Sequence, residues 1–239
     1  MPEVFFIRHG ERKDAVEGTR ARPVPELVSL SQKGRYQSFA LCAELARNEK
    51  KPDLIVLSPF RRTLETALPA IQHFHDTPVE MWDDAGEFTY LTPSLVQGTT
   101  AAERFGYKNG YWQECNPSRK DTYAESFSEF VQRVRKVLDK LSALPPETRV
   151  YLFSHEQFIH TARLIAAFPK ANDKELMRMF KITMDQPTLK NATTRIQNGQ
   201  IIRAVINERG IVFGKDDKIR PEHLTPMSDR VSKGISRTP

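Results

Sequence analysis

The chain has 239 residues, 39% of them hydrophobic, which fits one compact domain with a buried core. Its 36 Lys and Arg outnumber its 30 Asp and Glu and leave a net charge of +6, a balance that suits an anionic ligand. No apolar run reaches the roughly 20 residues of a membrane span. The basic residues form no long run and do not alternate with aromatic residues. We therefore expect neither a membrane nor a nucleic-acid partner.

The cysteine content favours a reducing compartment. Only two cysteines occur, Cys42 and Cys115, and their spacing is not that of a metal site. The N-terminus has no basic stretch ahead of an apolar segment, so a signal peptide is not expected. These features together predict a cytoplasmic protein without a bound metal.

Short apolar segments alternate with amphipathic ones along most of the chain. Strands are predicted over residues 4–8, 54–57, 79–81 and 150–153. Helices are predicted over residues 30–48, 58–74, 125–144 and 158–168. This order predicts an α/β fold in three layers, with a mostly parallel central sheet and helices on both faces.

The remaining segments are harder to assign. Residues 14–25 are a polar loop, and residues 91–122 are interpreted as an insertion over the sheet edge, with a helix near 99–105. Residues 193–197 and 201–206, joined by Asn198-Gly199, predict a β-hairpin. Its edge is compatible with pairing between two copies, so a dimer is one alternative. A polar tail at 214–239 leaves a single domain at 1–213.

Three of the predicted strands end in residues that suit an anion. Arg8, His9 and Arg12 follow the first strand, a Ser-Pro-Phe-Arg-Arg segment at 58–62 follows the second, and Ser154-His155 closes the last. Because the carboxyl ends of parallel strands meet at one edge of a sheet, we expect these groups to converge. Helix N-termini at that edge add N–H donors, so the sequence predicts a pocket for a phosphoryl dianion.

These segments resemble the histidine phosphatase superfamily, which includes cofactor-dependent phosphoglycerate mutases and many phosphatases. The similarity covers residues 4–206, and it implies a phosphoglycerate mutase-like fold of branch 1. Five matches occur in order: Arg8-His9-Gly10, Leu30-Ser31-Gln32-Lys33-Gly34, Ser58-Pro59-Phe60-Arg61-Arg62, Glu125-Ser126 with Arg133, and Phe153-Ser154-His155.

The start of the chain resembles one group within this superfamily. Arg8-His9-Gly10-Glu11-Arg12 is similar to the phosphatase domains of the suppressors of T-cell-receptor signalling, a resemblance that implies Arg12 contacts phosphate. Mutases usually carry Ser or Thr after the glutamate and an asparagine a few residues later. Arg12 and Ala15 stand at these positions here, which disfavours a mutase.

The resemblance also implies the roles of the predicted site residues. His9 would attack phosphorus and become a phosphohistidine. Arg8, Arg62 and His155 would hold the phosphoryl oxygens. Arg61 is the alternative to Arg62, because neighbouring helical residues point about 100° apart and only one can face the pocket.

A carboxyl group is needed to protonate the leaving group, and the sequence offers several. Glu87 falls where the family places its general acid, and a raised pKa would suit this role. Asp83 and Asp84 are close rivals. Glu156 is another, because the acid phosphatase branch carries its acid directly after the second histidine.

Two further features are assigned no role in the chemistry. His73 and His75 alternate at a helix end without a third metal ligand nearby, so a surface position is the preferred interpretation. Asn191 matches a polar position in the family and is expected to satisfy backbone groups.

The predicted function is metal-independent and cofactor-independent hydrolysis of phosphomonoesters, through a phosphohistidine at His9 with Glu87 as acid. The substrate would be a phosphorylated small molecule or a phosphoprotein. The alternatives are a mutase-type phosphotransferase and a non-catalytic phosphate-recognition module. Residues 14–25 and 91–122 should line the mouth of the pocket, with these side chains: Arg20, Arg22, Arg104, Tyr107, Lys108, Tyr111, Trp112, Arg119 and Lys120.

Overall fold

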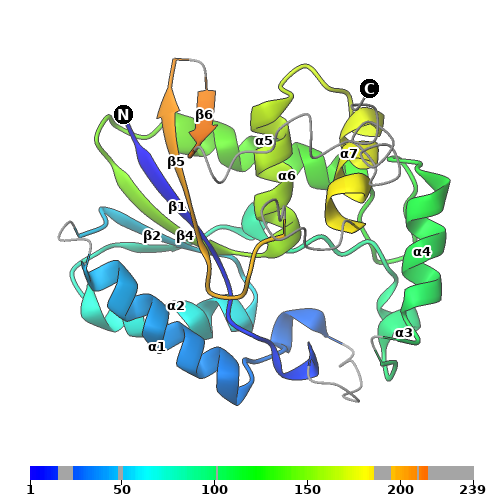
Figure 1. Ribbon diagram of the computed structural model, residues 1–239, viewed down its shortest axis with the longest axis horizontal. Helices are drawn as coiled ribbons and strands as arrows, with labels where there is room; N and C mark the ends of the chain where they lie inside the picture. Colours follow the sequence, from blue (N-terminus) through cyan, green and yellow to red (C-terminus); the bar gives the residue numbers. More distant parts are fainter. Residues whose placement is uncertain (16–23, 48–50, 101, 186–194, 209, 215–239) are drawn as a thin grey trace, which may run out of the picture.

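A mixed sheet forms the centre of the protein in the computed structural model, which describes residues 1–15, 24–47, 51–100, 102–185, 195–208 and 210–214. The sheet has six strands in the order β3-β2-β4-β1-β5-β6 (Figure 1). They are β1 (Glu3–Arg8), β2 (Leu54–Leu57), β3 (Val79–Met81), β4 (Arg149–Ser154), β5 (Ile201–Asn207) and β6 (Gly210–Phe213).

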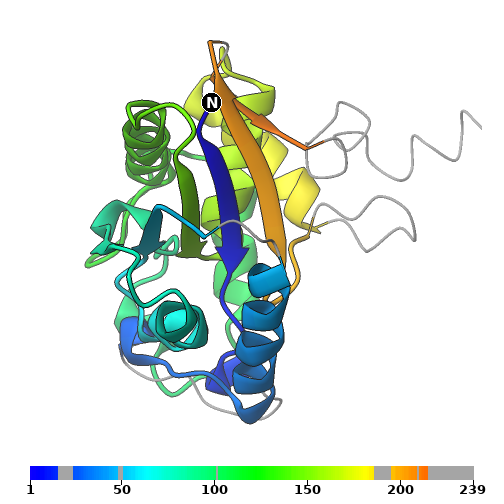
Figure 2. The same cartoon turned by 90° about the vertical axis from the view of Figure 1, so that its left-hand side faces the viewer.

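The four strands β1 to β4 run parallel to one another, and β5 and β6 are antiparallel additions at one edge. Figure 2 shows β1 between β4 and β5, so the N-terminal strand is interior to the sheet. The predicted fold class, a three-layer α/β/α arrangement with a mostly parallel sheet, is confirmed.

Helices cover both faces because the central strands are apolar on both sides. Helices α1 (Gln32–Arg47) and α2 (Arg61–His73) lie on one face, and α5 (Phe127–Ser142) and α6 (Glu156–Ala167) on the other (Figure 1). In β1, Phe5 and Ile7 belong to the core cluster under α1 and α2, whereas Val4 and Phe6 belong to the cluster under α5 and α6. This continuous apolar run is typical of a buried parallel strand.

Helix α5 begins at a capping box. The Ser126 side chain accepts a hydrogen bond from the Glu129 backbone N–H, and the Glu129 carboxylate accepts one from the Ser126 backbone N–H. These bonds satisfy two of the N–H groups that a helix start leaves free. The cap therefore fixes where α5 starts.

The insertion contains two helices, α3 (Pro93–Val96) and α4 (Phe105–Glu114). The helix predicted near residues 99–105 is therefore wrong, because α4 begins only at Phe105. Two aromatic residues expected at the pocket mouth are core residues instead. Tyr111 is 1% exposed, and Trp112 stacks on Phe180 with ring centroids 4.9 Å apart. Burying these rings stabilises the insertion on the body of the protein.

The predicted β-hairpin between residues 193–197 and 201–206 is also wrong, because its second strand pairs with other segments. Residues 195–197 form no strand, and β5 pairs with β1 and β6. The Asn198-Gly199 turn serves the site instead, because the Gly199 N–H donates to the Arg8 carbonyl at 3.0 Å. The burial of Ile202, Ala204 and Ile206 explains the pairing of β5 with β1. Residues 193–194 and the tail at 215–239 lie outside the described residues.

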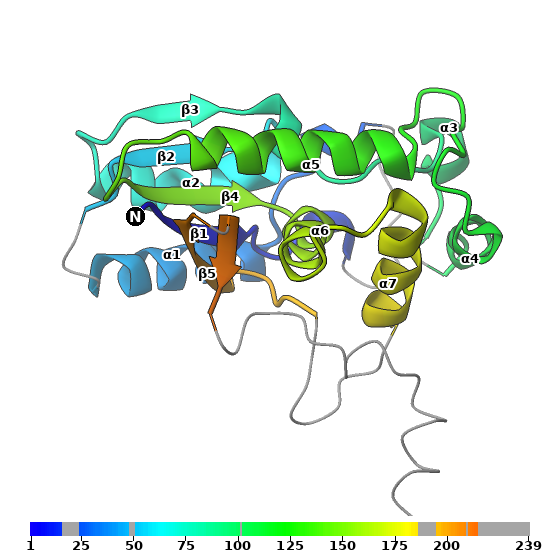
Figure 3. The same ribbon diagram turned by 90° about the horizontal axis from the view of Figure 1, so that it is seen from above.

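Helix α7 (Asp173–Asp185) was not predicted, and it packs its Leu176, Met177 and Phe180 into the core. Three 3-10 turns complete the described elements: η1 (Lys13–Ala15), η2 (Pro25–Leu27) and η3 (Asp83–Ala85). Figure 3 shows β1, β2 and β4 pointing toward the side of the molecule on which α3, α4 and α7 lie. Of the helices that the structure describes, none combines the length and the apolar character of a membrane span.

Candidate active site

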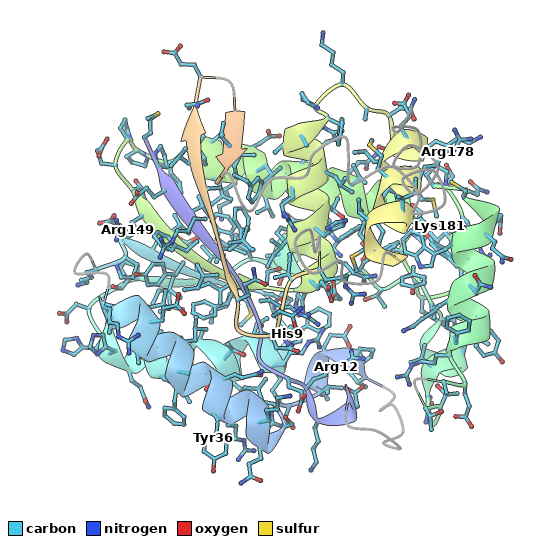
Figure 4. The ribbon with its side chains drawn as sticks, in the orientation of Figure 1. His9, Arg12, Tyr36, Arg149, Arg178 and Lys181 are labelled. Atoms are coloured by element: carbon cyan, nitrogen blue, oxygen red, sulfur yellow. The ribbon has the colours of Figure 1, made fainter. Side chains whose placement is uncertain are left out.

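The carboxyl ends of three adjacent parallel strands bring the predicted site together. His9 follows β1, Ser58 follows β2, and His155 follows β4. The imidazole rings of His9 and His155 have centroids 5.1 Å apart and meet edge to face. Figure 4 shows His9 at the end of β1 and Arg12 just beyond it. The site thus lies where ligands bind in open α/β sheets.

The hydrogen bonds of His9 define its tautomer. Nδ1 lies 2.6 Å from the Gly10 carbonyl oxygen, which can only accept, so Nδ1 carries the proton. Nε2 accepts a hydrogen bond from Arg62 Nε at 3.1 Å. The ring is neutral, with the Nε2 lone pair directed toward the arginine.

Arg62 connects the two histidines. Its Nη2 lies 3.1 Å from His155 Nδ1, and its Nη1 donates to the Pro25 carbonyl at 2.9 Å. The side chain is almost fully buried and rests against the Phe60 ring, and burial lowers its pKa to about 10. Arg61, the alternative, is exposed and pairs with Glu65 at 2.7 Å.

His155 is held from its other side by Ser58. Because Nδ1 faces the arginine donor, Nε2 carries the proton and donates to the Ser58 hydroxyl at 2.7 Å. Burial and the charge of Arg62 lower the pKa of both His9 and His155 well below the ordinary value of 6.5. Both rings are therefore neutral at neutral pH in the unliganded protein.

Arg8 is oriented by a carboxylate that follows the second histidine. Its Nη1 pairs with Glu156 at 3.1 Å and donates to the Ile196 carbonyl. Glu156 also accepts two hydrogen bonds from Arg195, at 2.5 and 3.0 Å. Arg8 Nε is buried and has no hydrogen-bond partner among the described residues. A buried donor without an acceptor is costly, so this N–H is available for a ligand.

Arg12 lies beside the pocket rather than deep within it. Its Nε pairs with the buried carboxylate of Asp14 at 3.0 Å, and its side chain is 35% exposed. The charge of Arg12 nevertheless contributes to the lowered pKa values of His9 and Arg62, so it is close to both. Arg12 therefore lies close to His9 and Arg62, with part of its side chain exposed.

Glu87 follows η3 and is partly buried. Burial raises its pKa, and the neighbouring charges of Arg62 and Arg8 oppose that rise. Its carboxylate contacts only the adjacent Phe88 N–H, at 3.2 Å, among the hydrogen bonds of the described residues. Burial thus lets Glu87 keep its proton at a higher pH than an exposed glutamate does.

Arg133 on α5 fixes the backbone that carries Glu87. It donates to the carbonyl oxygens of Asp84, Gly86 and Glu87 at 2.7 to 2.9 Å, and to the Glu125 carboxylate. Glu125 and Arg133, which belong to the motifs that resemble the superfamily, therefore hold the backbone around Glu87 in place.

The turn after His9 packs against the start of α1 with no space for side chains. A Cβ on Gly34 would lie 2.1 Å from the Glu11 carbonyl oxygen, and one on Gly10 would lie 2.6 Å from the Gly34 oxygen. The Glu11 carboxylate accepts from the Ser31 hydroxyl, and the Gly10 N–H donates to Thr66. The Leu-Ser-x-x-Gly segment therefore acts by positioning the histidine turn.

The other predicted residues fall away from this cluster. Asp83 is exposed, and Asp84 pairs with Lys136 at 2.7 Å. His73 and His75 are exposed, and no group of three metal-ligating side chains is found among the described residues. Asn191, Arg20 and Arg22 lie outside the described residues.

Two contacting residues were missed by the sequence analysis. Asn198 donates to the His9 carbonyl at 3.0 Å, and Arg195 pairs with Glu156. Both come from the irregular segment before β5, where no periodicity or motif marks them. The Asn198-Gly199 pair does predict a turn, and the structure has a turn there, although no hairpin strand precedes it.

Comparison with known proteins places this geometry in a family. The model of the histidine phosphatase superfamily (branch 1) matches residues 4–201. A curated protein of Schizosaccharomyces pombe, named a probable phosphatase, is 24% identical over 159 residues, which is 64% of this chain and 73% of that protein.

Solved structures share the fold at low sequence identity. YhfR of Bacillus stearothermophilus aligns with a TM-score of 0.68 and 18% identity, over 94% of this chain and all of that chain. The alpha-ribazole phosphatase of Shigella flexneri aligns with a TM-score of 0.65 and 19% identity, over 89% of this chain and 94% of that chain. A mycobacterial glucosyl-3-phosphoglycerate phosphatase aligns with a TM-score of 0.65 and 20% identity, over 89% of this chain and 96% of that chain.

The matched family and the names of these relatives support a phosphatase enzyme. The match runs from the first histidine-bearing strand through the second and on to the start of β5. The chain therefore belongs to the histidine phosphatase superfamily, branch 1.

Proposed function

We propose that the protein hydrolyses phosphomonoesters without a metal, through a covalent phosphohistidine on His9. The observation that carries this proposal is the tautomer of His9, whose Nδ1 proton is held by Gly10. Its Nε2 lone pair is thereby free to attack phosphorus once a substrate displaces the contact with Arg62. In the first step the Nε2–P bond forms and the bond between phosphorus and the leaving oxygen breaks.

Glu87 supplies the proton that the leaving oxygen needs. In the second step water attacks phosphorus, Glu87 takes a proton from that water, and the Nε2–P bond breaks to release inorganic phosphate. His9 returns to its neutral form and Glu87 to its protonated form, so the cycle closes without another reactant. The raised pKa of Glu87 supports this role.

Glu156 is less suited to be the acid. Its two carboxylate oxygens are paired with guanidinium groups, those of Arg8 and Arg195. A general acid has to direct a proton at the leaving oxygen, and these contacts already occupy both oxygens of Glu156. The geometry therefore favours Glu87 as the acid and Glu156 as the residue that orients Arg8.

The phosphoryl oxygens would be held by a ring of donors. Arg8 Nε, which has no partner among the described residues, and the Arg62 guanidinium beside His9 Nε2 would act as preorganised donors, which stabilise the charge that develops in the transition state. In the unliganded protein the one ring proton of His155 is donated to Ser58, so His155 would donate to the phosphoryl group from Nδ1 after taking up a second proton together with the dianion. Arg12 would complete the ring from the mouth. Its position after Glu11 in a start that is similar to the T-cell-receptor suppressor phosphatases supports this assignment.

The test is hydrolysis of 4-nitrophenyl phosphate in the presence of a chelator from pH 4 to 8. We expect wild-type protein quenched in alkali to carry a phosphohistidine, which is stable at high pH. His9→Ala should abolish both this phosphoenzyme and turnover. His73→Ala is the matched control, because His73 is exposed on α2. Retained turnover in purified His9→Ala protein would contradict the proposal.

Two other outcomes would assign a different function. Wild-type protein that binds orthovanadate but turns over no ester would be a phosphate-recognition module. Transfer of phosphate between two hydroxyls of phosphoglycerate, faster than release of inorganic phosphate, would indicate a mutase.

A further inference from the structure

A second group of basic side chains lies on the insertion at the start of α4, near enough to Arg12 for its charge to act on them. Arg104 immediately precedes α4, and Lys108 is four residues later, so the two share one side of the helix. Arg104 is 4% exposed, and its Nη1 donates to the Thr99 carbonyl at 2.6 Å. Arg104 is thus a fixed charge, not a loose surface residue.

Lys108 is half-buried and lacks a counter-ion. Among the described residues its Nζ has no hydrogen-bond or ion-pair partner. Burial lowers its pKa, and the positive charges of Arg104, Arg12 and Arg195 lower it further. Asp14 is the carboxylate that opposes them, and it is already paired with Arg12.

Other basic residues of the same insertion are arranged differently. Arg119 pairs with Glu114 at 2.7 Å, and Lys120 pairs with Glu129 at 2.6 Å. Their charges are compensated by partners on the protein. Arg104 and Lys108, in contrast, form no ion pair with a described residue, and the charge of Arg12 acts on both of them.

Arg12 links this group to the phosphoryl pocket. Its charge acts on His9 and Arg62 on one side and on Arg104 and Lys108 on the other. Figure 3 agrees with this placement, because the strands that carry the histidines point toward α4. A ligand whose phosphoryl group lies against His9 would extend past Arg12 toward α4.

We propose that Arg104 and Lys108 bind a second anionic group on the leaving-group side of the substrate, so that the preferred substrates are phosphomonoesters carrying a further phosphate or carboxylate. This inference rests on the proposed hydrolysis at His9. The second anion would supply a counter-ion for Lys108 and would reduce the electrostatic repulsion between Arg12, Arg104 and Lys108.

The test measures binding, so that it does not depend on turnover. Calorimetry on the His9→Ala protein compares 3-phosphoglycerate with glycerol 3-phosphate, and fructose 1,6-bisphosphate with fructose 6-phosphate. Each pair differs in one anionic group, a carboxylate in the first and a phosphate in the second. We expect the doubly anionic member of at least one pair to bind about tenfold more tightly, and the responding pair identifies the anion.

Variants in the same background locate the second group. Lys108→Gln should reduce the affinity ratio of the responding pair about fivefold or more, and Arg104→Lys should reduce it less because the charge remains. Lys120→Gln removes a charge from the same insertion and should leave the ratio unchanged. Circular dichroism and melting temperature show whether each variant is folded.

The two proposals fail separately. Equal affinity within both pairs, or an affinity ratio that Lys108→Gln leaves unchanged, overturns the second-anion site even if His9-dependent hydrolysis of 4-nitrophenyl phosphate is observed. Absence of that hydrolysis overturns the proposed function, while the calorimetry still reports whether a second anion is bound.

Discussion

The guanidinium of Arg62 donates through Nε to Nε2 of His9 over 3.1 Å, inside a pocket where the arginine is almost fully buried. The same group reaches the second histidine, so one side chain fixes the spacing of both rings. A planar fork can make these contacts simultaneously, whereas an ammonium group cannot. Burial lowers the pKa of His9, and the positive charge of Arg62 lowers it further, so the nucleophile stays neutral.

Arg62→Lys should therefore lower kcat/KM for 4-nitrophenyl phosphate by about 100-fold or more, as the loss of a transition-state donor does in other enzymes. Arg61→Lys is the control, because the neighbouring side chain is exposed and pairs with Glu65. Similar losses in the two variants would show that Arg62 has no special contact with the phosphoryl group.

Glu87→Gln should have an effect that depends on the leaving group. A poor leaving group such as an alkoxide needs protonation, so kcat for an alkyl phosphate should fall by about 100-fold or more. The loss with 4-nitrophenyl phosphate should be much smaller, because that phenolate leaves without a proton. Asp83→Asn is the control, since Asp83 is exposed. Equal losses on both substrates would exclude a proton-donor role.

The pH profile of kcat/KM for an alkyl phosphate should have its maximum below neutral pH. The lowered pKa of His9 keeps the nucleophile neutral well below pH 6.5, and the raised pKa of Glu87 keeps the acid protonated above its ordinary value of 4.5. The basic limb reports loss of the Glu87 proton, so it should disappear in Glu87→Gln. A basic limb that persists unchanged would assign the acid elsewhere.

Folding stability should fall as the pH drops below about 6.5, the value at which histidines protonate in the unfolded chain. His9, His155 and His160 are buried and have pKa values well below that, so the unfolded state binds protons that the native state does not. Thermal melting from pH 7.5 to 5 measures the effect. A melting temperature that rises on acidification in this range would contradict the neutral state of the three rings.

Glu156→Gln tests whether this residue positions Arg8. The change removes the negative charge that pairs with both Arg8 and Arg195. We expect a lower melting temperature and a roughly tenfold loss of kcat/KM. The basic limb of the pH profile should remain, which separates this role from that of the acid. Loss of the limb in Glu156→Gln, with its retention in Glu87→Gln, would reverse the two assignments.

Gly34→Ala tests the close packing under the histidine turn. The added Cβ would lie 2.1 Å from a backbone oxygen, so either α1 or the turn has to move. We expect the free energy of unfolding to fall by about 1–3 kcal/mol and the activity to fall more than in Gly106→Ala. Gly106→Ala is the control, because a Cβ there has no neighbour within 4 Å. Equal melting temperatures for the two variants would refute the contact.

Much of the fold could be predicted because its signals are local. The four parallel strands are short apolar runs, and the apolar periodicity and capping box of α5 mark a helix without reference to the rest of the chain. The order of these elements limits the topology to a doubly covered sheet. The same order brings residues at the strand ends together, so the sequence predicts that Arg8, His9, Arg62 and His155 meet at one edge of the sheet.

What the sequence could not decide depends on contacts between distant segments. The pairing of β5 with β1 and β6, rather than with residues 195–197, follows from which faces are buried in the assembled sheet. Tyr111 and Trp112 were expected at the pocket mouth, but Tyr111 packs on Phe88 and Tyr90, and Trp112 stacks on Phe180 of α7. These partners are distant in the sequence, so local periodicity does not reveal the contacts.

The sequence by itself determined which residues can carry phosphoryl chemistry, because residue type and strand order fix the chemical groups and the edge at which they meet. Only the tertiary structure decided their states. The pairing of Glu156 with Arg8 and Arg195 joins segments that are far apart in the chain. The lowered pKa of His9 and the raised pKa of Glu87 arise from burial and from charged neighbours such as Arg62. Electrostatic free energies depend on distance and desolvation, and both are properties of the folded arrangement.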